Sequence, residues 1–253
     1  MIAPPLRFRF RGQALELGGR PKLMGVVNAT PDSFSDAGLH PTLEERVELA
    51  RSLIDAGAEL IDIGGESGVT NRPPVRPAEE IERVVPLVER VSGDLGVPVS
   101  VDTYKPEVAR AAIAAGASIV NDISGLRDPL LADVCAETGA GLILMHTRAA
   151  PKQKLLDPSL DGRIADDVEE FLRERIALAG ERGVAFEQLM LDPGPGTLAA
   201  VAHGVAAGVH VLRVHDVGDV ADFLAVDAAL SSAFELDSEL RVADAIRWEQ
   251  DSE

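Results

Sequence analysis

Short apolar runs that end in polar residues alternate with amphipathic stretches along most of this chain. The first run, Leu23 to Val27, leads into a loop rich in Asn, Asp, Ser and Thr. Seven such runs begin near residues 22, 60, 97, 118, 141, 188 and 209. Runs of this length fit buried strands, and the stretches between them have helical spacing. Strands that alternate with helices indicate a parallel sheet with right-handed crossovers.

Helix signals lie between consecutive runs. Thr42 and Glu45 form a capping box, apolar residues recur on one face up to Ala56, and Gly57 can end that helix. Further helices are expected over about residues 78–91, 106–116, 128–139, 163–180 and 198–207. Pro86 is expected to kink the first of these, because proline removes a backbone hydrogen bond.

Polar residues follow nearly every predicted strand, not only one or two strands at a switch point. This pattern favours a TIM (β/α)8-type barrel, an α/β fold, over an open doubly wound sheet. A closed barrel of this class has eight strands, but only Pro193 to Gly208 separates the sixth run from the last. Because this segment has room for one helix, the barrel is predicted to lack one βα unit there.

The 253 residues suit a single barrel domain, residues 1–253. Within it, alternating residues from Leu6 to Phe10 and from Ala14 to Leu17 predict an N-terminal hairpin inside residues 1–20. Residues 234–253 form an acidic C-terminal tail.

The chain is strongly acidic, with a formal net charge of −18 at pH 7. Nucleic acids and anionic membranes need a positive surface, so neither is an expected partner. A small molecule is the expected partner instead. If that molecule carries phosphate, an acidic protein needs clustered Arg and His residues or a bound metal to receive it.

The single cysteine, Cys135, excludes an intrachain disulfide and fits a reducing compartment. It lies in an Ala-rich helical stretch, where it is expected to be a small buried hydrophobe. No apolar run approaches the roughly 20 residues of a membrane span, and the first residues lack the apolar core of a signal peptide. A cytoplasmic location is expected.

Two long strand exits offer ligand groups. The loop from Asn28 to Gly38, which includes Asp32 and Ser33, supplies oxygens that suit Mg²⁺ bridged to a substrate phosphate. A capped surface loop is the alternative. The exit after Gly64 carries Thr70 and Arg72, which can engage an anion or carboxylate, although an idle loop has the same composition.

Carboxylate and amide groups end three other strands, at Asp102, Asn121 and Asp192. Together they can recognise a heterocycle with adjacent donors and acceptors, although each alone could be a helix cap. Arg213 and His215 lie two residues apart, so they share a face and suit an oxyanion. His215 could instead be structural, and His146 is a weaker candidate. The set matches no catalytic triad, zinc site, P-loop or dinucleotide fingerprint.

These residues together resemble dihydropteroate synthase of folate biosynthesis. MGVVNATPDSFSDAG is similar to the first signature of that family, and DIGGES with the Thr, Arg and Pro that follow it is similar to the second. SVDT, NDISG, LDPG and RVHDV resemble its later strand ends. The similarity runs from about Lys22 to Ala229.

The resemblance implies a homodimeric (β/α)8 enzyme that joins 6-hydroxymethyl-7,8-dihydropterin diphosphate to 4-aminobenzoate and releases pyrophosphate. By motif, the pterin would be held by Asp102, Asn121 and Asp192, with Met145 packing nearby. Asn28 would contact Mg²⁺ on the diphosphate, which Arg213 and His215 would bind. The loops with Asp32, Ser33, Thr70 and Arg72 would form the 4-aminobenzoate pocket. The diphosphate would leave first, giving a pterin cation that the aniline attacks.

Two departures from the family pattern matter. GVTNRPP is longer between Ser67 and the arginine than the commonest pattern, which affects the assignment of Thr70. LDPGPG runs straight into TLAAVAHG, so the family's Ser-Arg-Lys strand end has no counterpart. The gap coincides with the missing βα unit. Unless Lys22 or Lys105 substitutes for the absent lysine, we expect greatly reduced activity.

Two other classes of protein remain open. One is a different enzyme on the same barrel, such as a pterin-dependent methyl-transfer domain, although the TPDSFSD and RVHDV loops speak against it. The other is a non-catalytic pterin-binding homologue, which the absent Ser-Arg-Lys segment favours.

Overall fold

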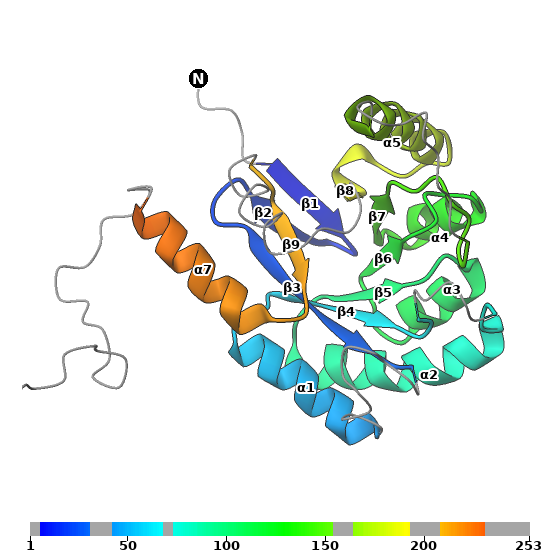
Figure 1. Ribbon diagram of the computed structural model, residues 1–253. Coiled ribbons are helices and arrows are strands. Elements are labelled where there is room, and N and C mark those ends of the chain that lie inside the picture. Colours follow the sequence, from blue (N-terminus) through cyan, green and yellow to red (C-terminus); the bar gives the residue numbers. More distant parts are fainter. Residues whose placement is uncertain (1–5, 31–41, 68–72, 154–163, 193–207, 231–253) are drawn as a thin grey trace, which may run out of the picture.

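The computed structural model describes residues 6–30, 42–67, 73–153, 164–192 and 208–230. Its centre is a curled sheet of seven parallel strands in the order β8-β7-β6-β5-β4-β3-β9 (Figure 1). The strands are β3 (Lys22–Asn28), β4 (Leu60–Gly64), β5 (Val99–Asp102), β6 (Ile119–Asp122), β7 (Gly141–Met145), β8 (Leu189–Asp192) and β9 (Val211–Val214). The expected parallel sheet and its seven strands are therefore confirmed.

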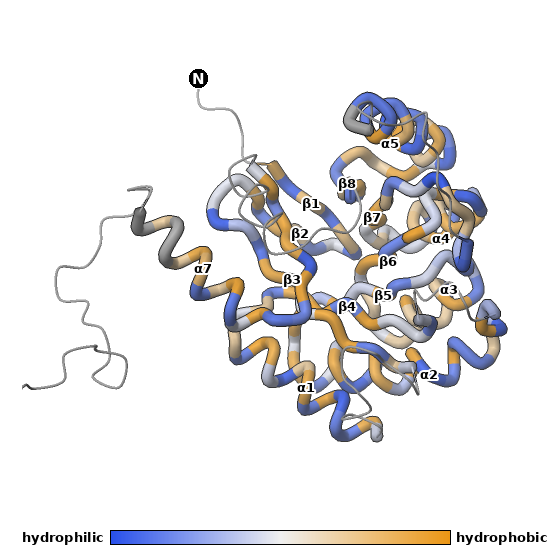
Figure 2. The backbone as a smooth tube through the Cα atoms, viewed as in Figure 1, coloured by the Kyte–Doolittle hydropathy of each residue, from blue (hydrophilic) through white to orange (hydrophobic). Residues whose placement is uncertain are grey.

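Helices cover the outer side of the sheet (Figure 1). They are α1 (Leu43–Asp55), α2 (Pro77–Arg90), α3 (Pro106–Ala114), α4 (Leu130–Thr138), α5 (Ile164–Glu181) and α7 (Val217–Leu230). Apolar and polar residues alternate along the helices (Figure 2), and α1 to α4 each bury apolar residues on one side. The buried core between these layers includes Cys135, as expected. Burial raises the pKa of its thiol to about 12, which makes the thiol inert.

Local signals placed most helix ends correctly. The capping box at α1 is present, because Glu45 N donates to Thr42 Oγ1 at 3.2 Å and Thr42 N donates to Glu45 Oε2 at 3.1 Å. Pro86 lies inside α2, which passes into a short π-helix, η1 (Val91–Leu95). Gly96 ends η1 at a φ of 69°, in the left-handed region that favours glycine. The helix expected over 198–207 and the tail over 234–253 lie outside the described residues.

The sheet is a half-barrel, not a closed ring, over the part of the chain that the structure describes. β8 pairs with β7 and β9 pairs with β3, so β8 and β9 are the two edges of the strand order. Between these strands the described residues contain no further strand. This arrangement agrees with a TIM-type barrel that is one βα unit short.

An antiparallel hairpin of β1 (Leu6–Phe10) and β2 (Gln13–Leu17) packs inside the half-barrel. Phe8 and Phe10 form an apolar cluster with four interior strand residues: Met24, Leu60, Ile119 and Ile143. A Cβ atom built at Gly141 would lie 2.5 Å from Phe8 Cζ, so glycine is required where the ring meets β7. The hairpin therefore closes one end of the interior.

We predict that Phe8→Ala lowers the free energy of unfolding by about 3–5 kcal/mol, because it removes a buried ring from this cluster. Leu6→Ala on the same strand is the matched control. Leu6 is 55% exposed, so its truncation should change stability by less than about 0.5 kcal/mol. Urea denaturation followed by circular dichroism measures both values. Equal losses in the two variants would contradict the role given to the hairpin.

Candidate active site

The carboxyl ends of four neighbouring strands lie at one level of the sheet. The strand register pairs Asn28 on β3 with Gly64 on β4. It pairs Gly64 with Asp102 on β5, and Asp102 with Asn121 on β6. Polar side chains that were predicted from separate motifs are therefore brought together in one row.

A network of charged groups lies beside this row. Arg213 Nε on β9 donates to Asp62 Oδ2 at 2.7 Å, and Arg213 Nη2 donates to Asp102 Oδ2 at 2.9 Å. Asn121 Nδ2 donates to the same Asp62 oxygen at 3.2 Å. One guanidinium thus bridges carboxylates from β4 and β5.

Asp62 is a site residue that the sequence reasoning missed. It belongs to the DIGGES string, where it stands within a buried strand and its side chain is fully buried. Strand side chains alternate between faces, so residues 62 and 64 share the interior face. That alternation is the signal that could have identified Asp62 beside the expected Asp102.

Three buried polar atoms of the interior have no hydrogen-bond partner among the described residues. They are Asp62 Oδ1, Ser100 Oγ and Asn121 Oδ1, on β4, β5 and β6. Buried polar groups are nearly always paired, and an unpaired group costs about 1–3 kcal/mol. The geometry therefore favours a polar ligand with hydrogen-bond donors over an apolar one.

Burial dominates the electrostatics of this site. It raises the pKa of the Asp102 carboxyl to about 7, and the negative charges of Asp62, Glu80 and Asp122 add to the rise, whereas Arg213 opposes it. The carboxylates around Arg213 raise the pKa of its guanidinium, which stays charged. Asp102 thus gains or loses its proton near neutral pH, where that change alters its ability to accept a ligand's N–H groups.

The other predicted residues fall at different places. Met145 and Asp192 are register partners at the ends of β7 and β8, which lie one and two strands beyond Asn121 on β6. His215 follows β9 and is exposed, so the structure places it at the rim of the strand ends. The remaining predicted site residues lie outside the described residues: Asp32, Ser33, Thr70 and Arg72.

His146 is placed in a structural contact instead of the network. Its Nε2 lies 2.9 Å from Asp167 Oδ2, and its ring packs edge-on against Phe171. Burial lowers the pKa of His146, and the nearby Arg148 acts in the same direction. The residue links the exit of β7 to α5.

Neither lysine that could replace the absent Ser-Arg-Lys lysine is free to do so. Lys22 Nζ pairs with Glu59 at 2.6 Å at the start of β3, the end of the strand opposite the site. Lys105 Nζ is held between the carboxylates of Glu66 and Glu80. Neither Lys22 nor Lys105 is therefore placed to replace the absent lysine at the row of strand ends.

The oxygen groups at the strand ends suit Mg²⁺ only in part. The described residues contain no group of three or more His, Cys, Asp or Glu side chains suited to a metal. Asn28, at the end of β3, supplies an amide oxygen at the row of strand ends. Mg²⁺ commonly keeps several waters and binds through one or two protein oxygens plus substrate phosphates. Asn28 fits an ion that arrives with a phosphorylated substrate, and does not fit a site built by protein alone.

Carboxylate, amide and guanidinium groups at the carboxyl ends of barrel strands define a small-molecule site of the TIM-barrel class. The sequence matches the family described as pterin binding enzyme over residues 24–197. It is 40% identical to dihydropteroate synthase of Escherichia coli over 205 residues, which are 81% of this chain and 72% of that protein.

Solved structures give the same result. The Yersinia pestis dihydropteroate synthase in complex with a sulfonamide drug has a TM-score of 0.81 at 32% identity, over 90% of this chain and 100% of that one. The Burkholderia cenocepacia enzyme complexed with 7,8-dihydropteroate has a TM-score of 0.77 at 32% identity, over 90% and 98%. The chain belongs to the dihydropteroate synthase family. No helix in its described part is long and apolar enough to cross a membrane.

The raised pKa of Asp102 predicts a pH-dependent stability. The unfolded carboxyl titrates near 3.8, so between about pH 4 and pH 7 the folded protein keeps a proton that the unfolded chain releases. Asp102 therefore contributes stability that is complete below about pH 4 and is lost as the pH rises through about 7. Asp102→Asn removes this titration. We expect the free energy of unfolding of the variant, minus that of wild type, to rise between pH 5 and pH 7 by on the order of 1 kcal/mol per pH unit.

Urea denaturation at several pH values measures this difference. The control is Asp94→Asn, which removes a half-exposed carboxylate paired with Arg90. Its difference from wild type should show no comparable rise in that range. A constant offset between wild type and Asp102→Asn would contradict the raised pKa.

Proposed function

We propose that this chain is a dihydropteroate synthase, a transferase that joins 6-hydroxymethyl-7,8-dihydropterin diphosphate to 4-aminobenzoate and releases pyrophosphate. The single observation that supports it best is the convergence of Asp62, Asp102, Asn121 and Arg213 at the strand ends. The B. cenocepacia relative, complexed with the reaction product, supports the same assignment.

In this proposal the polar interior holds the pterin. The carboxylate of Asp102 accepts a pair of N–H groups, while the amide of Asn121 both gives and accepts hydrogen bonds. Asp192 completes the recognition, and Met145 packs against the ring system. Asp62 joins this set because its unpaired Oδ1 adds an acceptor on the interior face.

The leaving group requires positive charge. Arg213 and His215 bind the diphosphate and stabilise the charge that develops as it leaves, before the aniline nitrogen attacks the pterin carbon. Asn28 would hold Mg²⁺ on the diphosphate, where the ion would neutralise part of the phosphate charge. Asp32, Ser33, Thr70 and Arg72 are assigned to the 4-aminobenzoate side. The working form is proposed to be a cytoplasmic homodimer.

A second candidate function is pterin binding without catalysis. The sequence has no counterpart of the family's Ser-Arg-Lys strand end, and both Lys22 and Lys105 are held in ion pairs with glutamates. In this case the chain keeps the residues that bind the pterin but lacks the positively charged strand end that lines the reaction site in the family.

Calorimetry and a turnover assay separate the two candidates. The chain is mixed with pterin diphosphate, with and without Mg²⁺, and then with 4-aminobenzoate, and dihydropteroate is followed by chromatography. Product that depends on Mg²⁺ supports the synthase. Pterin binding without product supports the non-catalytic homologue, and the lack of any pterin binding by the folded chain would contradict both.

We predict that Asp102→Ala weakens binding of pterin diphosphate by about 10- to 100-fold, because a hydrogen bond to a charged group contributes about 1.5–3 kcal/mol. Asp94→Ala, which removes a half-exposed carboxylate on η1, is the matched control and should bind as wild type does. Isothermal titration calorimetry measures the dissociation constants. Unchanged affinity in Asp102→Ala would remove Asp102 from the proposed pterin site.

A further inference from the structure

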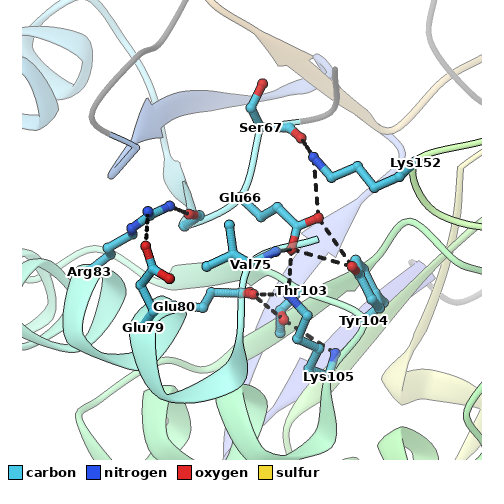
Figure 3. A network of polar contacts seen from close by, with 11 residues as sticks. Glu66, Ser67, Val75, Glu79, Glu80, Arg83, Thr103, Tyr104, Lys105 and Lys152 are labelled. Carbon is cyan, nitrogen blue, oxygen red and sulfur yellow. Dashed lines mark hydrogen bonds and ion pairs between the residues drawn. The ribbon is translucent and has the colours of Figure 1, made fainter. Parts of the chain in front are cut away.

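Four charged side chains are buried together in one cluster (Figure 3), and three of them line a cavity that Asp102 also lines. Glu66 follows β4, Glu80 lies on α2, and Lys105 and Lys152 follow β5 and β7. Their side chains are 10% exposed or less, and that of Glu80 is only 1% exposed. The motifs gave Glu66, Glu80 and Lys152 no part in substrate binding, and considered Lys105 only as a replacement for the absent lysine.

Lys105 is the centre of this cluster. Its ammonium group contacts one carboxylate oxygen of Glu66 and one of Glu80. Figure 3 shows Lys152 reaching Glu66 from the other side, with Nζ 3.2 Å from Oε1. The hydroxyl of Tyr104 also donates to Glu66, at 3.1 Å. The negative charges of the two carboxylates equal the positive charges of the two ammonium groups.

Thr103 connects the cluster to the proposed pterin site. Its hydroxyl donates to Glu80 Oε1 at 2.7 Å, and its backbone N–H donates to Asn121 O at 3.1 Å. Thr103 directly follows Asp102. Thr103 therefore connects the buried carboxylate of Glu80 on α2 to the main chain of Asn121 and to its own neighbour, Asp102.

Glu80 has little freedom to move away. A Cβ atom built at Gly65 would lie 2.8 Å from Glu80 Cγ and 2.7 Å from Val84 Cγ1. The exit of β4 thus packs directly on α2 at Glu80. The cluster and Asp102 line one cavity of about 40 Å³, whose lining includes Glu66, Glu80, Asp102 and Thr103.

We propose that Glu80 and Lys105 are positioning residues for the pterin substrate, holding Asp102 and Asn121 in binding geometry through Thr103. Glu80 fixes the Thr103 hydroxyl, and Lys105 keeps Glu80 in place and balances its charge. The inference rests on the proposed function. It adds a residue of α2 to the strand-end residues that support pterin binding.

The charge balance of the cluster matters because nearby charges change the pKa of Asp102. The negative charge of Glu80 raises the pKa of Asp102, as do those of Asp62 and Asp122, while Arg213 lowers it. Removal of Lys105 leaves two buried carboxylates with less compensation. These carboxylates repel each other and the ionised form of Asp102, so the acceptor that the pterin needs is weakened as well as displaced.

A purely structural role makes a different prediction. Buried ion pairs contribute little net stability, and loss of one partner is harmful mainly because the other charge is left unpaired. If the cluster were only structural, its variants would lower stability and affect both substrates alike. If it positions Asp102 and Asn121, pterin binding should fall selectively.

The test uses Thr103→Val and Lys105→Met in the full chain. Thr103→Val leaves all charges in place, and we expect it to weaken pterin diphosphate binding by about 3- to 10-fold. Lys105→Met should weaken it by at least about 10-fold. The double variant Glu80→Gln/Lys105→Met should recover much of this loss, because the substituted side-chain amide still accepts from Thr103 without a charge. Where turnover is measured, KM for 4-aminobenzoate should stay unchanged.

Two controls match these changes in chemistry. Thr138→Val removes a hydroxyl that donates to Val134 O at 2.6 Å on α4, and Arg110→Met breaks an exposed pair with Glu137. Both should bind pterin as wild type does. Urea denaturation shows which variants remain folded, and if Lys105→Met does not fold, Thr103→Val decides alone.

The outcomes are distinguishable. If wild type itself fails to bind pterin diphosphate, the proposed function fails. If wild type binds and folded Thr103→Val binds equally well, the positioning role is wrong while the proposed function stands. A double variant that binds more weakly than Lys105→Met would also overturn the role, because it would show that the charge of Glu80 is needed in itself.

Discussion

The bridge that Arg213 makes between Asp62 and Asp102 is the interaction on which the site depends. A fully buried carboxylate such as Asp62 is tolerated only when a partner compensates the loss of hydration. Arg213 supplies that partner from β9, which pairs with β3 and not with β4 or β5. One long side chain therefore joins the last strand of the sheet to its middle and allows two acids to lie in an otherwise apolar interior.

Under the proposed function, the same bridge also affects which form of the pterin binds well. The pterin offers N–H groups to Asp102, and the Arg213 guanidinium already donates to that carboxylate. A pterin that displaced Arg213 would gain one set of hydrogen bonds and lose another, with little net benefit. A pterin that also carries a diphosphate gives the guanidinium a new anion, to which it binds strongly in a bidentate manner. The arrangement thus favours the diphosphate ester over the free pterin alcohol.

Local patterns predicted the elements and the row of strand ends, but not the partners across the sheet. A continuous apolar run predicted β3 and a capping box predicted α1, and parallel pairing then brought Asn28, Asp102 and Asn121 to one level. The partners of Arg213 lie 151 and 111 residues away in sequence, so only the crossing of the strands determines them. Lys105 was a candidate replacement for the absent lysine for the same reason. Its contact with Glu80 forms only when α2 packs on the exit of β4.

The half-barrel is held together by side chains where strand pairing stops. Met190 on β8 and Val211 on β9 both pack against the cluster of Phe8 and Phe10, although their strands lie at opposite edges of the sheet. Arg11 ties the hairpin to the sheet and its helices, because its N–H donates to Gly139 O at 2.6 Å and its guanidinium donates to two carbonyls after α3 and at its end. A closed ring uses backbone hydrogen bonds at this point, and such bonds fix strand positions more tightly than apolar contacts do. The hairpin can therefore preserve the core and the residues proposed to bind the pterin, although the described residues contain no further strand between β8 and β9.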